Sequence, residues 1–304
     1  MEETKLIWMN NKMTPWHECK THFLTHTAHY GSGVFEGVRC YNTEKGPAIF
    51  RLDEHIQRLF YSASVFGIKI PYTEKELIEA CIKVIKENEL KSGYIRPLVF
   101  YGYGKMGLDT IGAKIEVGIA AWPWEAYLGK EGIEKGVSVK ISPFIRPSRD
   151  VMPTNAKVTG NYANSIMAKM DALNTGFKDA ILLDKNKNVA ECSAENFFMV
   201  KKKVLITPST ENCLEGITRK SVIEIAKDLG VKVDERIIPS KELFKAEEAF
   251  MTGTAAEISP ITSIDGKAIG LGKPGKITQK IQKKFYDAVS GKEKKYLKWL
   301  TYVK

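Results

Sequence analysis

Apolar and polar residues alternate along this chain in a way that predicts interleaved strands and helices without a regular strand–helix repeat. In the first part, short apolar runs between turn residues predict strands at 6–9, 34–41, 48–51, 95–101 and 115–121. Apolar residues at helical spacing predict a helix at 53–66, with Asp53 as its N-cap, and a second helix at 73–90. The second helix should begin with a capping box formed by Thr73 and Glu76.

The second part of the chain continues the mixed pattern. Strands are predicted at 137–141, 180–183, 196–200 and 204–206, and helices at 161–174 and 218–229, the last closed by Gly230. The first of these helices carries an apolar side formed by Ala163, Ile166, Met167, Met170 and Leu173. The lysines at 201–203 are typical of a hairpin tip, and the tail after Gly291 predicts the solvated face of a terminal helix.

An aromatic, glycine-containing stretch separates the two parts. We therefore predict a small N-terminal α/β domain at 1–121, an interdomain loop at 122–136 and a larger C-terminal α/β domain at 137–304. Because strands and helices do not alternate steadily, the mixed α/β (α+β) class is favoured over a barrel or a doubly wound sheet.

Composition excludes several classes of protein. The 304 residues are 43% hydrophobic and 27% charged, which is typical of a globular chain and not of a disordered one. Apolar runs stay below the roughly 18 residues of a membrane span. The acidic start without an apolar core is unlike a secretory signal, and the five cysteines form no C-x-x-C pair, so we expect reduced thiols and a cytoplasmic protein.

The net charge of +10 raises the question of an anionic partner. Basic residues are spread along the chain, and no finger, basic zipper or RNP-like motif accompanies them. We therefore expect no nucleic acid partner and no membrane partner, and we assign most of the charge to a solvated surface.

Two motifs carry weak signals. Residues 102–107 match G-x-G-x-x-G after a strand, but the next segment, 108–114, contains a glycine and leads into another strand, so a hairpin is favoured over a dinucleotide site. His22, His26 and His29 cluster without a nearby Cys, Asp or Glu, so we expect no metal site.

Lys157 is the first candidate for chemistry. It lies between apolar residues just before a Gly-Asn turn into an amphipathic helix, where partial desolvation favours Schiff-base chemistry. Two small-residue segments, 216–218 and 252–256, could offer backbone N–H groups and hydroxyls to a phosphate. Together with the acidic Glu191, they point to pyridoxal phosphate. Each feature alone also fits an exposed lysine, a helix cap or an ordinary turn.

Seven segments in order resemble the class IV aminotransferases, which are pyridoxal phosphate enzymes of fold type IV, and specifically the branched-chain amino acid aminotransferases. The resemblance is nearly full length and implies the two-domain fold of D-amino acid aminotransferase. Its segments are 29–39 (HYGSGVFEGVR), 55–59 (HIQRL), 94–97 (YIRP), 156–162 (AKVTGNY), 191–196 (ECSAEN), 214–219 (LEGITR) and 253–257 (GTAAE).

The resemblance implies a role for each cofactor-binding residue. Lys157 should hold the cofactor through its amine and carry a proton, Glu191 should pair with the pyridine nitrogen, and Tyr162 should hydrogen-bond the ring hydroxyl oxygen. The phosphate should be held by Arg58, Ile217, Thr218 and Thr254. Pyridoxamine 5'-phosphate is the expected intermediate form of the cofactor.

The resemblance also implies a substrate pocket. Tyr94 and the backbone amides of Thr254 and Ala255 should receive the α-carboxylate, while Arg96 and Tyr30 should meet the distal carboxylate of glutamate. Tyr30 and the loop containing Met106 and Leu108 should reach across from a partner subunit, so at least a homodimer is expected, and a larger assembly such as a hexamer stays open. The remaining pocket residues are Phe35, Gly37, Arg39, Trp124 and Tyr127.

The implied activity is that of a branched-chain-amino-acid transaminase. It transfers the amino group reversibly from L-leucine, L-isoleucine or L-valine to 2-oxoglutarate by a ping-pong reaction, as expected of amino-acid biosynthesis. The alternatives are a D-amino acid aminotransferase or an aminodeoxychorismate lyase on the same fold, and a binding module without catalysis. One departure from the family pattern is Cys192-Ser193-Ala194, where glycines are common, and it raises the hypothesis that Cys192 is sensitive to oxidation.

Overall fold

The computed structural model describes residues 2–124 and 128–304. The chain divides into two compact units. Unit 1 comprises Met1–Trp124, Ala156–Asn161 and Ala288–Lys304, and unit 2 comprises Glu125–Asn155 and Tyr162–Asp287. Each unit is therefore built from segments that are distant in the sequence, and the predicted linear domain boundaries stay a prediction.

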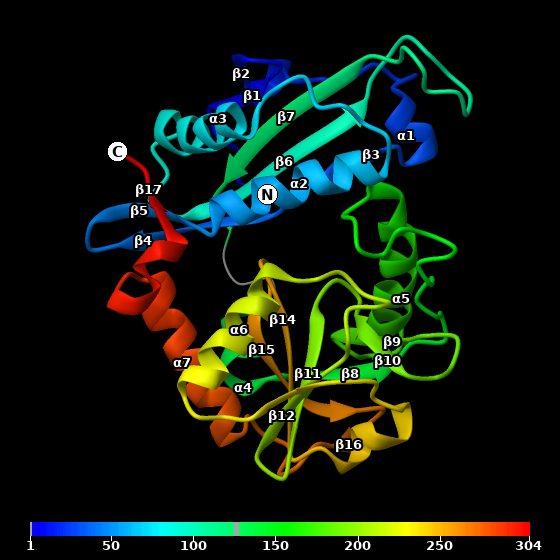
Figure 1. Ribbon diagram of the computed structural model, residues 1–304, viewed down its shortest axis with the longest axis vertical. Coiled ribbons are helices and arrows are strands. Elements are labelled where there is room, and N and C mark those ends of the chain that lie inside the picture. Colours follow the sequence, from blue (N-terminus) through cyan, green and yellow to red (C-terminus); the bar gives the residue numbers. More distant parts are fainter. Residues whose placement is uncertain (1, 125–127) are drawn as a thin grey trace. The chain divides into compact units, whose positions relative to one another are not determined.

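Unit 1 is built on an antiparallel sheet (Figure 1). Its strands are β1 (Leu6–Met9), β2 (Lys12–Pro15), β3 (Gly33–Phe35), β4 (Val38–Thr43), β5 (Gly46–Phe50), β6 (Gly93–Tyr101), β7 (Ile115–Trp122) and β17 (Leu300–Tyr302). The strand order is β17–β5–β4–β6–β7–β1–β2, and β3 pairs with β6. The helical elements are η1 (Trp16–Glu18), α1 (His26–Tyr30), α2 (Leu52–Val65), α3 (Glu74–Glu87), η2 (Thr159–Asn161) and η4 (Lys294–Trp299).

The core of unit 1 lies between its sheet and the pair α2–α3. Leu52, Ile56 and Leu59 recur at helical spacing on α2, and all three are fully buried against strand residues such as Ile95 and Val117. Burying a side chain of this kind stabilises the fold by about 1.5–3 kcal/mol. This packing fixes the face of α2 that carries His55 and Arg58.

Unit 2 is built on a mixed sheet. Its strands are β8 (Val137–Ile141), β9 (Asp179–Leu183), β10 (Val189–Cys192), β11 (Asn196–Lys201), β12 (Val204–Thr207), β13 (Val233–Glu235), β14 (Glu248–Gly253), β15 (Glu257–Ile264) and β16 (Lys267–Ala268). The order is β10–β9–β8–β15–β14–β11–β12–β13, and β16 pairs with β15. The helical elements are α4 (Gly129–Lys135), α5 (Tyr162–Asn174), α6 (Ile217–Asp228), η3 (Ser240–Lys245) and α7 (Lys276–Val289), whose last residues belong to unit 1.

The sheet of unit 2 is mixed because helices connect some of its strands. β8 is parallel to both β9 and β15, and β12 is parallel to β13, while the other pairs along this path are antiparallel. Parallel neighbours need a crossover connection, and the one from β8 to β9 contains α5, which packs against β9 (Figure 1). The structure thus confirms the predicted mixed α/β class.

Several predicted elements are confirmed by the structure. The strands at 6–9 and 137–141 have the predicted bounds, and Thr73 and Glu76 form the capping box of α3. Lys202 and Lys203 both have positive φ in the turn between β11 and β12, as a hairpin tip requires. Gly230 follows α6 with a φ of 72°, the left-handed conformation that closes a helix.

Three local predictions are wrong. The predicted strand at 34–41 is split between β3 and β4, since β3 ends at Phe35 and the next residue, Glu36, turns toward α2. α2 begins at Leu52 after Arg51 in the left-handed conformation, so Asp53 lies inside the first turn and is not the N-cap. The predicted interdomain loop at 122–136 stays a prediction, and the structure places α4 within it. The tail forms the short η4 and a strand paired with β5, with the aromatic rings of Tyr296 and Trp299 buried.

The predicted apolar side of α5 is exposed. Ile166, Met167, Met170 and Leu173 are each 45–61% accessible to solvent, whereas Ser165, Ala168 and Ala172 are buried. Small residues allow the helix to lie close to the sheet of unit 2. The larger side chains are left on the outer side, where they form an apolar face that we call the α5 face.

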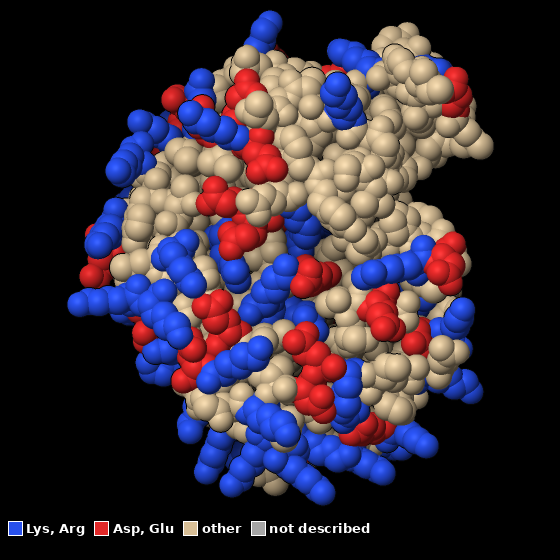
Figure 2. Space-filling view, in the orientation of Figure 1, with Lys and Arg blue, Asp and Glu red and all other residues tan. Residues whose placement is uncertain are grey.

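Surface charge follows the pattern expected from the sequence. Basic side chains are spread over the visible face with acidic side chains between them (Figure 2). Among the described residues, none of the helices combines the length and the apolar character that crossing a membrane requires.

Candidate active site

Lys157 is held by its backbone in unit 1. Its N–H donates to the Ser62 Oγ at 2.9 Å, and its carbonyl accepts from the N–H of Phe35 at 3.1 Å. The next residue, Val158, forms a β-bridge with Val34. The Lys157 Nζ lies 4.9 Å from the centre of the Phe35 ring. The amine is therefore directed over an aromatic face while the backbone on either side is anchored.

A close backbone approach fixes the segment that follows Lys157. Gly31 has a φ of 61°, and a Cβ on it would lie 2.8 Å from the Gly160 Cα. The Gly31 carbonyl accepts hydrogen bonds from the Gly160 N–H and from the Thr159 hydroxyl. Only a residue without a side chain fits this contact at Gly31. The segments 29–31 (HYG) and 156–162 (AKVTGNY) are separate motifs in the sequence, but in the structure they pack directly against each other.

A buried ion-pair cluster lies beside β3. Glu36 is fully buried and accepts hydrogen bonds from Arg58 at both oxygens, from Nε at 2.6 Å and from Nη2 at 2.9 Å. The His55 Nδ1 lies 2.7 Å from the Glu36 Oε2. His55 and Arg58 are three residues apart and so share one face of α2. The carboxylate therefore sets the plane of the Arg58 guanidinium.

The electrostatics of this cluster keep Glu36 ionised. Burial opposes its charge, but the attraction of Arg58 and His55 outweighs burial and holds the pKa of Glu36 well below its usual range. The pKa of His55 is lowered, first by burial and then by the charges of Arg58 and Lys157, against the opposing effect of Glu36. At neutral pH the cluster is therefore a Glu36–Arg58 ion pair with an uncharged imidazole.

Several predicted pocket residues lie together in unit 1. The Arg96 guanidinium lies 4.8 Å from the centre of the Phe35 ring and donates to the Tyr94 hydroxyl at 3.4 Å. The Tyr94 hydroxyl also lies against Gly37, where a Cβ would be only 1.8 Å away. Gly37 is therefore required for the observed position of Tyr94. The Nε of Arg96 is buried and makes no hydrogen bond in the described structure.

Trp124 and Arg39 extend this aromatic group. The ring of Trp124 contacts that of Tyr94 edge-on at 4.6 Å, and Arg39 donates to the Trp124 carbonyl at 3.1 Å. Tyr127, the remaining predicted wall residue, lies outside the described residues. The structure thus brings together six residues that were predicted for the substrate pocket: Phe35, Gly37, Arg39, Tyr94, Arg96 and Trp124.

Tyr30, Met106 and Leu108 lie on an exposed part of unit 1. Their exposed fractions are 42%, 42% and 88%. The His26 ring connects them, since it lies 4.6 Å from the Tyr30 ring and its Nε2 is 2.7 Å from the Gly107 carbonyl oxygen. The loop at 102–114, which contains the 102–107 motif, joins β6 to β7, as predicted for a hairpin. His26 is thus a structural residue in this part of the chain.

In unit 2, Glu191 lies on β10 and is buried. The Nε of Arg146 is 2.8 Å from its Oε1, and both side chains are less than 10% exposed. The neighbouring Cys192 is fully buried, and burial raises the pKa of its thiol well above the ordinary value. A buried, protonated thiol is a poor nucleophile, which argues against the hypothesis that Cys192 is sensitive to oxidation.

The start of α6 offers backbone donors. The helix begins at Ile217 after Gly216, and no side chain caps it. Ile217 and Thr218 are each only 4% exposed. The first N–H groups of a helix lack partners within the helix and carry a partial positive charge. An uncapped and buried helix start of this kind is suited to an anion.

The other predicted residues of unit 2 lie at element ends. Thr254 and Ala255 form the turn between β14 and β15. The hydroxyl of Thr252, at the end of β14, is buried without a hydrogen-bond partner in the described structure. Tyr162 is the first residue of α5 and is half-buried.

Sequence reasoning gave no role to Glu36, His55 and Arg146. Glu36 could have been found, because an acid within an apolar run needs a buried cation, and His55 and Arg58 share a helix face. Arg146 has no comparable signal, since its pairing with Glu191 depends on the sheet. Across the described residues, no group of three or more His, Cys, Asp or Glu side chains is placed to hold a metal.

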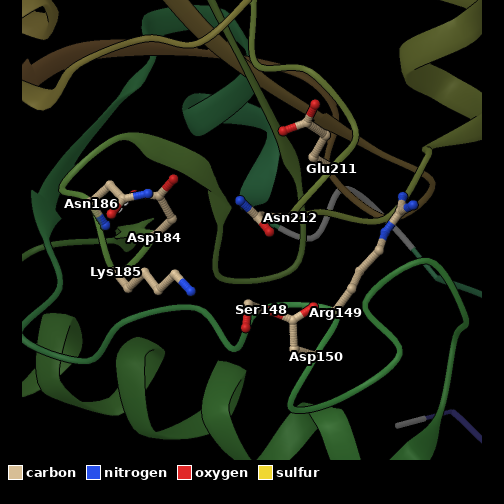
Figure 3. A pocket seen from close by; sticks show the side chains of 8 residues that line it. All are labelled: Ser148, Arg149, Asp150, Asp184, Lys185, Asn186, Glu211 and Asn212. Atoms are coloured by element: carbon tan, nitrogen blue, oxygen red, sulfur yellow. Dashed lines mark hydrogen bonds between the residues drawn. The ribbon is translucent and has the colours of Figure 1, made fainter.

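A polar pocket of about 250 Å³ opens on unit 2 (Figure 3). It is lined by side chains of both charges: Ser148, Arg149, Asp150, Asp184, Lys185, Asn186, Glu211 and Asn212. The predicted site residues do not line this pocket, and its mixed charge does not point to one class of ligand.

The fold and these residues define a class of enzyme. The sequence profile described as Amino-transferase class IV matches residues 33–264, and the chain belongs to this family. A branched-chain-amino-acid aminotransferase of Pseudomonas aeruginosa is 46% identical over 299 residues, which cover 98% of this chain and 97% of that protein.

Solved structures show the same likeness. The T.th. branched-chain amino acid aminotransferase with pyridoxamine 5'-phosphate has a TM-score of 0.97 and 45% identity, and the match covers 100% of both chains. The same enzyme with N-(5'-phosphopyridoxyl)-L-glutamate has a TM-score of 0.96 and 44% identity, again over 100% of both chains. The predicted family and its fold type IV are confirmed.

Proposed function

We propose that this protein is a pyridoxal-phosphate-dependent branched-chain aminotransferase. It transfers the amino group of L-leucine, L-isoleucine or L-valine to 2-oxoglutarate, reversibly and by a ping-pong reaction in the cytoplasm. The products are the branched-chain 2-oxo acid and L-glutamate. The observation that carries the proposal is the full-length likeness to a solved branched-chain aminotransferase with pyridoxamine 5'-phosphate.

The groups present in each unit fit this cofactor. Pyridoxal phosphate, when bound, supplies an aldehyde that reacts with amines and a ring that accepts electrons. Unit 1 offers the Lys157 amine and the oriented guanidinium of Arg58. Unit 2 offers the uncapped start of α6 and the buried carboxylate of Glu191. An amine, a cation, helix N–H groups and a buried acid are the donor set that an aldehyde, a phosphate and a basic ring require.

The residues that we propose for the chemistry have separate tasks. Lys157 holds the cofactor and carries the proton to and from the substrate Cα. Glu191 holds a proton on the pyridine nitrogen, and Tyr162 donates to the ring oxygen. The phosphate is held by four residues: Arg58, Thr218, Thr254 and, through its backbone N–H, Ile217.

We propose two kinds of substrate contact. Phe35, Gly37, Trp124 and Tyr127 form the wall for aliphatic side chains, with Arg39 supporting Trp124 through its carbonyl. Tyr94, with the Thr254 and Ala255 amides, receives the α-carboxylate, and Arg96 with Tyr30 receives the distal carboxylate. A single pocket can then accept leucine or glutamate, because it offers apolar surface with a few polar groups at its edge.

Arg96 provides a test of the dual pocket. We expect Arg96→Ala to lower kcat/KM for 2-oxoglutarate by about 10- to 100-fold, the effect of losing a charged hydrogen bond. The leucine half-reaction should change less, because its side chain has no carboxylate. Single-turnover rates of the two half-reactions measure the difference, with the exposed Arg149→Ala as control. Equal losses in both would contradict the assigned role.

We propose that the active form is at least a homodimer. The support is the exposed apolar surface described above: the α5 face, and the exposed Tyr30, Met106 and Leu108. An apolar surface of this kind is typical of a subunit interface. Sedimentation of the purified holoenzyme tests the proposal and separates a dimer from a hexamer, while a monomer with full activity would refute it.

A substrate screen tests the function as a whole. Purified holoenzyme is mixed with single amino acids, and the absorbance of the cofactor is followed as it accepts the amino group. We expect a response to L-leucine, L-isoleucine and L-valine and none to D-alanine. A response to D-alanine alone would indicate a D-amino acid aminotransferase, and pyruvate release from aminodeoxychorismate would indicate the lyase. No response to any substrate would indicate a binding module.

A further inference from the structure

Arg146 is held in place by the sheet of unit 2. The Ser142 N–H donates to the Ile181 carbonyl at 2.8 Å, and the Arg146 N–H donates to the Leu183 carbonyl at 2.8 Å. The chain after β8 therefore continues along β9. Pro147 follows Arg146 and favours an extended backbone for the residue before it. The origin of the Arg146 side chain is thus fixed by backbone hydrogen bonds and not by surface packing.

Glu191 is held on the other edge of the same strand. β10 pairs with β9, and Glu191 lies opposite Leu182 in that register. Two charged residues distant in sequence are thereby placed on opposite sides of β9, with their side chains meeting. The Arg146 Nε is 2.8 Å from the Glu191 Oε1, and the N–H does not point along this line, so the contact is an ion pair.

The ion pair between Arg146 and Glu191 is buried, which strengthens the attraction between the two charges. The side chains of Arg146 and Glu191 are 8% and 6% exposed. A charge pair in such surroundings is poorly screened by water, so replacing Arg146 by a neutral residue removes a close cation from the buried Glu191 carboxylate. The state of ionisation of Glu191 is therefore tied to Arg146.

Other titratable groups lie near Glu191, and the cation Lys169, which is paired with Asp179 at 2.5 Å, acts on two of them, Cys192 and Glu195. Glu195 has its pKa raised to about 8, first by burial and then by Asp179, with a smaller contribution from Glu191, so it is largely neutral at pH 7. Burial also raises the pKa of the Cys192 and Cys213 thiols, which stay protonated. The charges of Arg149 and Arg219 act near Cys213, but Arg219 is paired with Glu235 and donates to the Pro208 carbonyl.

We propose that Arg146 is a positioning residue that keeps Glu191 as a carboxylate and thereby keeps the proton on the pyridine nitrogen of the cofactor. The inference rests on the proposed function, in which Glu191 faces that nitrogen. A proton shared by a carboxylate and a pyridine nitrogen resides on the nitrogen only while the carboxylic acid is the stronger acid of the two. Removing the charge of Arg146 makes the Glu191 carboxylate less stable, which shifts the balance toward the neutral acid and neutral pyridine and weakens the ring as an electron acceptor.

The proposal is tested by measuring the protonation state of the cofactor's ring nitrogen. Holoenzyme is reconstituted with pyridoxal phosphate labelled with nitrogen-15 in the ring, and the nitrogen chemical shift separates pyridinium from neutral pyridine. In Arg146→Met, a variant of similar length without charge, we expect the neutral shift and a kcat lower by about 10- to 100-fold, as for the loss of supporting residues in other sites. Wild type and Arg146→Lys, which restores the charge, should show pyridinium.

Two further variants make the outcomes distinct. Arg236→Met removes an arginine that pairs with Asp234 and Glu242 away from the predicted site residues, and it should leave the shift unchanged. Glu191→Gln should give the neutral shift. If Glu191→Gln gives the neutral shift but Arg146→Met keeps pyridinium, the role of Arg146 is overturned while the proposed function stands. If Glu191→Gln keeps pyridinium, the proposed role of Glu191 itself fails.

A structural role alone would not give this pattern. If Arg146→Met fails to fold, Arg146→Gln and Arg146→Lys are compared in its place, since both retain hydrogen bonding and only lysine retains the charge. A chemical shift of neutral pyridine in Arg146→Gln, together with one of pyridinium in Arg146→Lys, supports the proposal. The same shift in both variants overturns it.

Discussion

Lys157→Ala is expected to lower the rate of transamination by about 10⁴-fold or more, because the variant loses both the amine that holds the cofactor and the group that carries the proton. The neighbouring structure should persist. The residue is anchored through its backbone, by the Ser62 hydroxyl and the Phe35 N–H, and alanine retains both contacts. Single-turnover kinetics with L-leucine measure the loss.

The same variant distinguishes chemistry from cofactor binding. Phosphate contacts do not involve the lysine, so Lys157→Ala should still bind pyridoxal phosphate, more weakly and without the absorbance band of the lysine-bound form. Lys75→Ala is a suitable control, since the Lys75 side chain is 86% exposed on α3. Turnover close to that of wild type in Lys157→Ala would refute the assignment of Lys157.

The elements that the sequence predicted well are those whose signals are local. The capping box of α3 needs only Thr73 and Glu76, and a strand such as β8 needs only its own apolar pattern. The helix α2 was predicted, but its N-cap was not, because tertiary contacts decide how this helix begins. Arg51 adopts the left-handed conformation before α2 and its N–H donates to the Trp299 carbonyl, from a segment near the end of the chain.

The candidate site shows the same division. Lys157 and Glu191 could be selected because their chemistry is rare in such surroundings and the family resemblance supplied their roles. The partners of these residues could not be selected in the same way. Arg146 meets Glu191 only because both flank β9, and Gly31 supports the Lys157 segment only through contact across more than a hundred residues. Contacts between residues that are distant in the sequence cannot be predicted from the local sequence pattern.

Glu36 is the residue whose loss should most affect stability. It is fully buried, and it compensates the charge of Arg58, whose side chain is only 14% exposed. Glu36→Ala leaves that guanidinium and the His55 ring without their acceptor, and removing one partner of a buried pair costs about 3–5 kcal/mol. Urea unfolding of the holoenzyme should show this loss. Glu54→Ala, on the same helix, removes a 41% exposed partner of Arg51 and should cost about 1 kcal/mol or less.

The dependence on pH separates this ion pair from simple packing. The pKa of Glu36 is depressed in the folded protein, since Arg58 and His55 outweigh burial, so its contribution is present above the unfolded pKa of about 4.3 and is lost as pH falls toward the folded value. The stability difference between wild type and Glu36→Gln should therefore be largest near pH 7 and should shrink as pH falls below about 4. A difference that stays constant over this range would mean that Glu36 acts through shape alone. Weaker binding of pyridoxal phosphate in the same variant would connect the pair to the orientation of Arg58, because Glu36 holds two of its guanidinium nitrogens.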